Sequence, residues 1–98
     1  MPPQIKIFTL STCSHCTQAK HYLEERELSY DSVSVDFLAG DERTRVLDTI
    51  RQLNPSVTFP TIVIDDTVII GFRPDEIDAA LRGSDGGADL PESIWQQP

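Results

Sequence analysis

Two cysteines, three residues apart, stand where an apolar run gives way to a helical pattern. Cys13-Ser14-His15-Cys16 holds both cysteines of the 98-residue chain and follows a mostly apolar run, residues 5–10. At the first turn of a helix, residues i and i+3 share a face, so the two sulfurs can approach bonding distance. Free backbone N–H groups and the helix dipole stabilise a thiolate there, and a thiolate is the species that attacks disulfides. The pair indicates a redox dithiol, with Cys13 as nucleophile and Cys16, one turn deeper, as resolving thiol.

Other interpretations of this pair stay open. A lone disulfide across so short a loop would add little stability, which disfavours a purely structural bridge. A zinc site could combine the cysteines with His15 or His21, although the usual second distant pair of ligands is absent from the sequence. A c-type haem attachment needs a histidine directly after the second cysteine, and this chain has Thr17 there.

The charge and length of the chain restrict its partners and location. A formal net charge of −8 at pH 7 argues against nucleic acid and anionic membrane surfaces, because both attract clusters of Lys and Arg. No apolar run approaches the roughly 20 residues of a membrane span. Residues 1–4 lack the basic-then-apolar plan of a signal peptide. We expect a cytoplasmic monomer in a reducing compartment, where cysteines are more often catalytic or metal-binding than structural.

The apolar periodicity predicts the order strand, helix, strand, helix, strand, strand, helix. These elements are expected at residues 5–10, 13–27, 30–37, 42–53, 61–64, 67–70 and 74–83. A helical crossover makes the first two strands parallel, and a hairpin joins the last two, so the sheet is mixed. We expect one domain over residues 1–83 and a flexible tail over 84–98, in which Leu90, Ile94 and Trp95 could dock on the domain or on a partner.

Two local expectations concern the ends of the first helix and the second strand. Ser11 and Thr12 are residues that commonly cap a helix, and they stand just before the helical pattern. Val33, Val35 and Phe37 alternate with polar residues, which predicts that all three lie on the inner face of one strand.

Two further segments, one before the third predicted strand and one after the hairpin, follow the cysteine pair along the chain. Thr58-Phe59-Pro60 directly precedes the third predicted strand, and Gly71-Phe72-Arg73-Pro74-Asp75 follows the hairpin. With these segments in order, residues 5–82 resemble the glutaredoxin family. The resemblance implies an α/β, thioredoxin-like fold with a mixed four-stranded sheet flanked by three helices. It also implies a dithiol thiol–disulfide oxidoreductase that reduces protein or glutathione disulfides, carries electrons and contributes to cell redox homeostasis.

The resemblance extends to individual residues. The implied substrate-binding residues are Thr58, Phe59, Pro60, Gly71 and Asp75. Pro60 is then expected to be cis and to face Cys13, and the backbone of Phe59 to pair with substrate in a strand-like manner. Asp75 matches an acidic residue that holds the amino end of glutathione. No metal or organic cofactor is implied; glutathione is a co-substrate, or a thioredoxin-reductase-type enzyme is the electron donor, and a disulfide-bearing protein is the substrate.

The chain departs from the family pattern at three places. Ser14-His15 replaces the usual Pro-Tyr or Pro-Phe, Leu10 replaces a basic residue, and Gly71-Phe72 replaces a double glycine. The Gly71-to-Asp75 segment is instead similar to redoxins that take electrons from thioredoxin reductase and supply ribonucleotide reductase. A carrier dedicated to one such partner, or a metal or iron–sulfur protein of the same fold, are the alternatives. A partly protonated His15 beside Cys13 would favour the thiolate and tune the dithiol.

Overall fold

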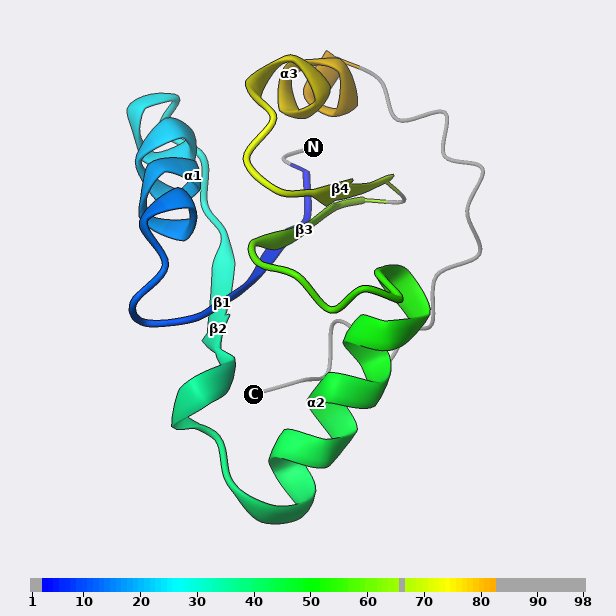
Figure 1. Cartoon of the computed structure of the whole chain (residues 1–98). Coiled ribbons are helices and arrows are strands. Elements are labelled where there is room, and N and C mark those ends of the chain that lie inside the picture. Colours follow the sequence, from blue (N-terminus) through cyan, green and yellow to red (C-terminus); the bar gives the residue numbers. More distant parts are fainter. Residues whose placement is uncertain (1–2, 66, 83–98) are drawn as a thin grey trace.

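The computed structural model describes residues 3–65 and 67–82, and its elements follow the predicted order (Figure 1). They are β1 (Ile5–Thr9), α1 (Ser14–Glu25), β2 (Asp31–Ser34), the 3₁₀ helix η1 (Val35–Phe37), α2 (Gly40–Leu53), β3 (Thr61–Ile64), β4 (Thr67–Ile70) and α3 (Pro74–Arg82). The predicted helix end at Gly83 and the tail 84–98, including Leu90, Ile94 and Trp95, lie outside the described residues. The boundary between domain and tail therefore stays a prediction.

The four strands form one mixed sheet in the order β2-β1-β3-β4. β1 runs parallel to β2, with Thr9 opposite Ser34 at the end of their pairing. β3 is antiparallel to both β1 and β4, as a hairpin requires. Every residue of the central strands β1 and β3 is buried, which confirms that the first apolar run is covered on both faces.

Helices cover both faces of the sheet (Figure 1). α1 and α3 pack on one face, over a buried cluster made of Ile5, Ile7, Ala19, Leu23, Ile62, Ile64, Ile69, Ile77 and Ala80. α2 packs on the other, over Phe8, Val33, Val35, Val46, Ile50 and Val63. Because successive strand residues point to opposite faces, Ile7 and its neighbour Phe8 belong to different clusters. The arrangement confirms the α/β thioredoxin-like fold with three helices around a mixed sheet.

The second strand is shorter than its alternating pattern suggests. β2 ends at Ser34, and the chain turns into η1. Val33 and Val35 are buried as expected, but Phe37 is 74% exposed. The prediction that Phe37 lies on the inner face is wrong, because a 3₁₀ helix has three residues per turn and ends the two-residue alternation of the strand.

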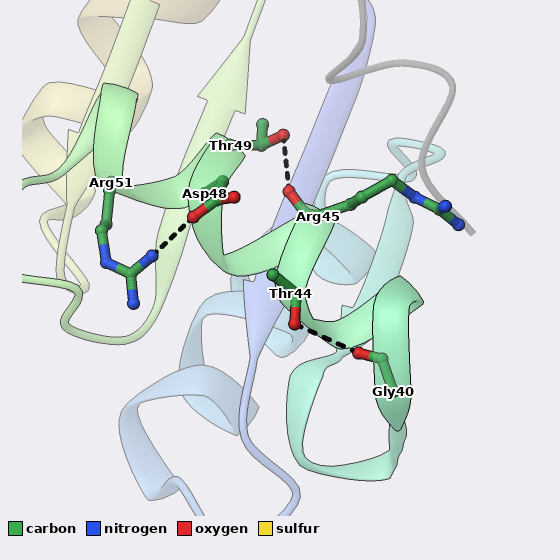
Figure 2. A network of polar contacts seen from close by, with 6 residues as sticks. All are labelled: Gly40, Thr44, Arg45, Asp48, Thr49 and Arg51. Atoms are coloured by element: carbon green, nitrogen blue, oxygen red, sulfur yellow. Dashed lines mark hydrogen bonds and ion pairs between the residues drawn. The ribbon is translucent and has the colours of Figure 1, made fainter.

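Several polar side chains of helix α2 bond within the helix itself, and the helix ends where the loop to β3 begins. Figure 2 shows the hydroxyls of Thr44 and Thr49 donating to the carbonyls of Gly40 (3.3 Å) and Arg45 (3.1 Å), one turn earlier. Arg51 lies 2.7 Å from Asp48, also within the helix. These three contacts each join residues three or four positions apart within α2. None of the helices in the described part of the chain is long and apolar enough to cross a membrane.

Candidate active site

The two cysteines lie at the amino end of α1, as the sequence predicts. Cys13 is the N-cap residue, and its Sγ accepts a hydrogen bond from the Cys16 N–H at 3.2 Å. Ser11 and Thr12 do not cap the helix; they form a turn closed by the Cys13 N–H and the Leu10 carbonyl at 3.1 Å. The sulfur of Cys13 therefore occupies the place that a serine or aspartate oxygen takes in an ordinary cap.

The two thiols differ in their surroundings. Both are free; Cys13 is half-buried, whereas Cys16 is only 1% exposed. Burial, together with the adjacent sulfur of Cys13, raises the pKa of the Cys16 thiol well above its usual value. Cys16 is thus a protonated, shielded thiol at neutral pH, and Cys13 is the more accessible residue of the pair. Across residues 3–65 and 67–82, no three His, Cys, Asp or Glu side chains gather as metal ligands would.

A second segment approaches Cys13 from the loop before β3. The Phe59–Pro60 peptide bond is cis, which confirms what the family resemblance implied. The Cys13 Sγ lies 3.9 Å from the Phe59 carbonyl oxygen. The Pro60 carbonyl accepts a hydrogen bond from the Gly71 N–H at 2.8 Å, and Gly71 has a positive φ of 86° that favours glycine. The loop before β3 and the turn after β4 are therefore joined beside the sulfur.

Asn54 holds this loop in shape. Its side-chain Nδ2 donates to the Thr58 carbonyl (3.1 Å), the Thr58 hydroxyl (2.9 Å) and the Thr61 hydroxyl (3.2 Å). The Thr61 hydroxyl in turn donates to the Thr58 carbonyl at 2.8 Å. The Thr58 side chain is thus engaged with Asn54, and its role in binding substrate stays a prediction. In the sequence, Asn54 signals only the end of a helix, so this supporting role was missed.

An open groove of about 340 Å³ lies beside the cis-proline loop. Its lining is His15, Phe59, Ile70, Gly71, Phe72 and Arg73. His15, Phe59 and Gly71 were expected near the site, whereas Ile70 was missed because it reads as an ordinary strand residue. Asp75 is exposed in the first turn of α3, and its contact with a ligand stays a prediction.

Aromatic and charged side chains behind the groove tie α1 to α3. The rings of Tyr22 and Phe72 meet edge to face, 5.7 Å apart. The Tyr22 hydroxyl donates to Asp78 at 2.6 Å, and the Arg26 guanidinium stacks 3.5 Å from the Tyr22 ring centre. The helix that carries the cysteines is thereby fixed to the segment that lines the groove.

Comparison with known proteins agrees with this geometry. The chain matches the family model described as glutaredoxin over residues 5–69. An uncharacterized glutaredoxin-like 8.6 kDa protein in the rubredoxin operon of Clostridium pasteurianum is 35% identical over 78 residues, 80% of this chain and 97% of that protein. The glutaredoxin-like protein NrdH of Salmonella typhimurium is 32% identical over 73 residues, 74% of this chain and 83% of that protein.

The solved structures agree with the sequence relatives. The crystal structure of the glutaredoxin from Methanosarcina mazei Go1 superposes with a TM-score of 0.74 at 38% identity, covering 80% of this chain and 77% of that one. The family model matches residues 5–69, which include both cysteines, and the Clostridium pasteurianum relative is matched over nearly its whole length. This chain therefore belongs to the glutaredoxin family.

Proposed function

We propose that this protein is a dithiol thiol–disulfide oxidoreductase that reduces disulfides of other proteins in the cytoplasm. The observation that carries the proposal is the asymmetry of the cysteine pair. Cys13 is half-buried and caps α1 with its sulfur 3.2 Å from the Cys16 N–H, whereas Cys16 is only 1% exposed. An accessible sulfur supported by helix N–H groups suits a nucleophile, and a shielded thiol within one turn suits a resolving group.

The reaction transfers two electrons from the dithiol to the substrate. The Cys13 thiolate attacks one sulfur of the substrate disulfide, and the other substrate sulfur leaves as a thiolate that takes up a proton. Cys16 then loses its proton and attacks the Cys13 sulfur, which releases the second substrate thiol and leaves a Cys13–Cys16 disulfide. The raised pKa of Cys16 keeps it from competing with Cys13 for the incoming disulfide.

Main-chain groups beside Cys13 support a protein substrate. Within residues 3–65 and 67–82, the Phe59 N–H donates to no other group, and its carbonyl points toward the Cys13 sulfur at 3.9 Å. An extended peptide that carries a disulfide could pair with this N–H in the manner of an added strand. Phe59, Ile70 and Phe72 add apolar side chains to the otherwise polar lining of the adjoining groove, and these could contact neighbouring side chains of the substrate.

The same groove favours a protein reductase over glutathione as the source of electrons. Glutathione is anionic, and the chain has a formal net charge of −8. Arg73 is the arginine that lines the groove, and its Nε lies 3.5 Å from a Glu76 carboxylate, which offsets its charge. Leu10 stands where many glutathione users have a cation. We therefore propose a thioredoxin-reductase-type donor.

Two cysteine variants test the proposed roles. Cys13→Ser is expected to abolish the reduction of a protein disulfide such as that of insulin. Cys16→Ser is expected to leave the first attack intact and to accumulate a mixed disulfide through Cys13, visible as an added mass in the intact protein. Full activity of the Cys13→Ser variant would refute the assignment.

A paired assay on the oxidised protein identifies the donor. One reaction contains glutathione, glutathione reductase and NADPH; the other contains thioredoxin reductase and NADPH without thioredoxin. Turnover only in the second supports the proposed donor. Turnover only in the first contradicts it and makes Asp75 the leading candidate for a glutathione contact. Absence of turnover in both, with two thiols titrating after chemical reduction, would favour a carrier dedicated to one partner or a metal-binding role.

A further inference from the structure

The turn that delivers Cys13 to α1 is held from the side by an acidic residue of η1. The Ser11 N–H donates to Asp36 Oδ1 at 3.1 Å, and the Ser11 hydroxyl donates to Asp36 Oδ2. Ser11 is one of the two central residues of the turn between Leu10 and Cys13. Its main chain and its side chain are therefore both fixed by one carboxylate, through two bonds to a charged acceptor.

The Ser11–Asp36 contact lies just beyond the end of the β1–β2 pairing, where a side chain takes over from main-chain hydrogen bonds. The main-chain pairing of β1 with β2 ends at Thr9 and Ser34. Ser11 and Asp36 each lie two residues beyond the end of their strand. By that point the chain that follows β2 has turned into η1 and no longer runs beside β1. The Asp36 carboxylate therefore supports the turn at the point where the β2 main chain no longer can.

We propose that Asp36 is a positioning residue for Cys13 that acts through Ser11. The inference rests on the proposed function, since it assigns Asp36 a part in the same reaction. The sulfur of Cys13 is placed by its distances to the Cys16 N–H (3.2 Å) and the Phe59 carbonyl (3.9 Å). Loosening the turn two residues earlier changes both distances, and a displacement of about 1 Å can cost on the order of a hundredfold in rate.

The ionisation of Asp36 allows it to accept both hydrogen bonds from Ser11 at every pH of interest. The hydrogen bond from the Ser11 hydroxyl lowers the pKa of Asp36, the Ser11 N–H adds to this effect, and the nearby Arg43 guanidinium does the same. Asp36 is thus a carboxylate, able to accept both bonds, throughout the pH range in which thiols react. Because the contact is exposed, water competes with it, and its loss should loosen the turn without unfolding the protein.

Asp36 could affect the midpoint pH of Cys13 alkylation in two opposite ways, through its charge and through its hydrogen bonds to the turn. A carboxylate charge disfavours a neighbouring thiolate, so a variant that changed the charge alone would lower the midpoint pH of Cys13 alkylation. A loosened turn weakens the Cys16 N–H bond to the sulfur and would make Cys13 ionise at higher pH. Measurement in 0.5 M salt screens the exposed charge and leaves the anchoring effect.

The test compares Asp36→Ala, Asp36→Asn and Ser11→Ala with Asp41→Ala, which removes an equal charge from the first turn of α2. Two quantities are measured on the reduced, intact protein in 0.5 M salt: the midpoint pH of Cys13 alkylation by iodoacetamide, and amide hydrogen exchange at Cys13, whose N–H closes the turn. We expect Asp36→Ala to raise the midpoint by about half a pH unit and to speed exchange on the order of tenfold. Asp36→Asn keeps one acceptor oxygen and should fall between that variant and the unaltered protein. Ser11→Ala keeps the N–H bond and should do likewise.

The outcomes separate this inference from the proposed function. If Asp36→Ala behaves like Asp41→Ala in both measurements, Asp36 does not position Cys13. A lowered midpoint with unchanged exchange would show an effect of charge alone and would also overturn the proposal. Neither measurement uses a disulfide substrate, so the inference about Asp36 can fail while Cys13 still proves to be the nucleophile. In turnover of a protein disulfide, Asp36→Ala is expected to lower kcat/KM roughly tenfold, with rescue by Asp36→Asn in part.

Discussion

Replacing Asn54 by alanine removes the side chain that shapes the loop carrying Phe59 and Pro60. Asn54 is 1% exposed, and its Nδ2 lies within hydrogen-bond distance of three acceptors, at 2.9, 3.1 and 3.2 Å. An amide has two N–H bonds, so at most two of these acceptors are fully served at once. The Thr58 carbonyl keeps its bond from the Thr61 hydroxyl at 2.8 Å, so the change leaves that carbonyl with a partner.

The expected loss in the free energy of unfolding follows from these contacts. Two hydrogen bonds contribute about 1 kcal/mol each, and the small void left by the amide adds to this. We expect Asn54→Ala to lose about 2–3 kcal/mol. For a domain of this size, that loss lowers Tm by roughly 10–20 °C. It should also lower kcat/KM at a temperature where the variant is fully folded, because the Phe59 carbonyl is no longer held near Cys13.

Urea unfolding at 25 °C, followed by far-ultraviolet circular dichroism, measures the loss. Thr58→Val is the matched control: it removes one exposed hydroxyl acceptor and leaves the carbonyl bond, so we expect it to lose under about 1 kcal/mol. The reasoning would be refuted if Asn54→Ala lost no more than this control. A loss of stability with unchanged kcat/KM would refute only the link between the loop and the reaction.

Three further perturbations test other parts of the structure. Iodoacetamide at pH 8 should label Cys13 and spare Cys16, because burial raises the pKa of Cys16. Labelling of Cys16 should increase only at a pH well above 9.0, the usual pKa of a cysteine thiol. Equal labelling of both cysteines at pH 8, measured by mass spectrometry, would contradict this. Tyr22→Phe removes the 2.6 Å bond to Asp78 but keeps the ring, so urea unfolding should show a loss of about 0.5–1.5 kcal/mol, and no change would show that the bond is not stabilising. Ile69→Ala empties a fully buried position between the sheet and α1 and α3, so we expect a loss of about 2–5 kcal/mol and a lower Tm by calorimetry; a loss under about 1 kcal/mol would mean that the core collapses around the void.

Much of the fold could be predicted because its signals are local. Helical spacing and the β-branched residues of the hairpin identify the elements, and the helical crossover fixes the parallel pair. Period-two alternation in the sequence predicts a strand that continues to Phe37, whereas β2 ends at Ser34. The sequence pattern also does not show that Asp36, two residues past the end of the strand, bonds to Ser11, 25 residues away.

The site shows the same division. Cys13 and Cys16 stand out by spacing alone, and the helix that follows them explains their chemistry. The cis bond at Pro60 followed from the family resemblance, since a loop proline ahead of a strand is trans in most proteins. Asn54 could not be predicted as a supporting residue, because a short polar residue before proline is an ordinary helix end and its three acceptors are brought to it only by the folded loop.

The Cys13 sulfur, which we propose as the nucleophile, also closes the first turn of its own helix. In an ordinary cap the acceptor atom never takes part in a reaction, whereas here the acceptor for the Cys16 N–H is the Cys13 sulfur itself. A sulfur bonded to a second sulfur carries no charge and accepts a hydrogen bond less well than a thiolate. Side-chain caps stabilise helices by about 1 kcal/mol, so each catalytic cycle would weaken and then restore part of that contribution. The order of the first turn of α1 would then vary with the oxidation state of the chain, and the Cys16 amide would report it.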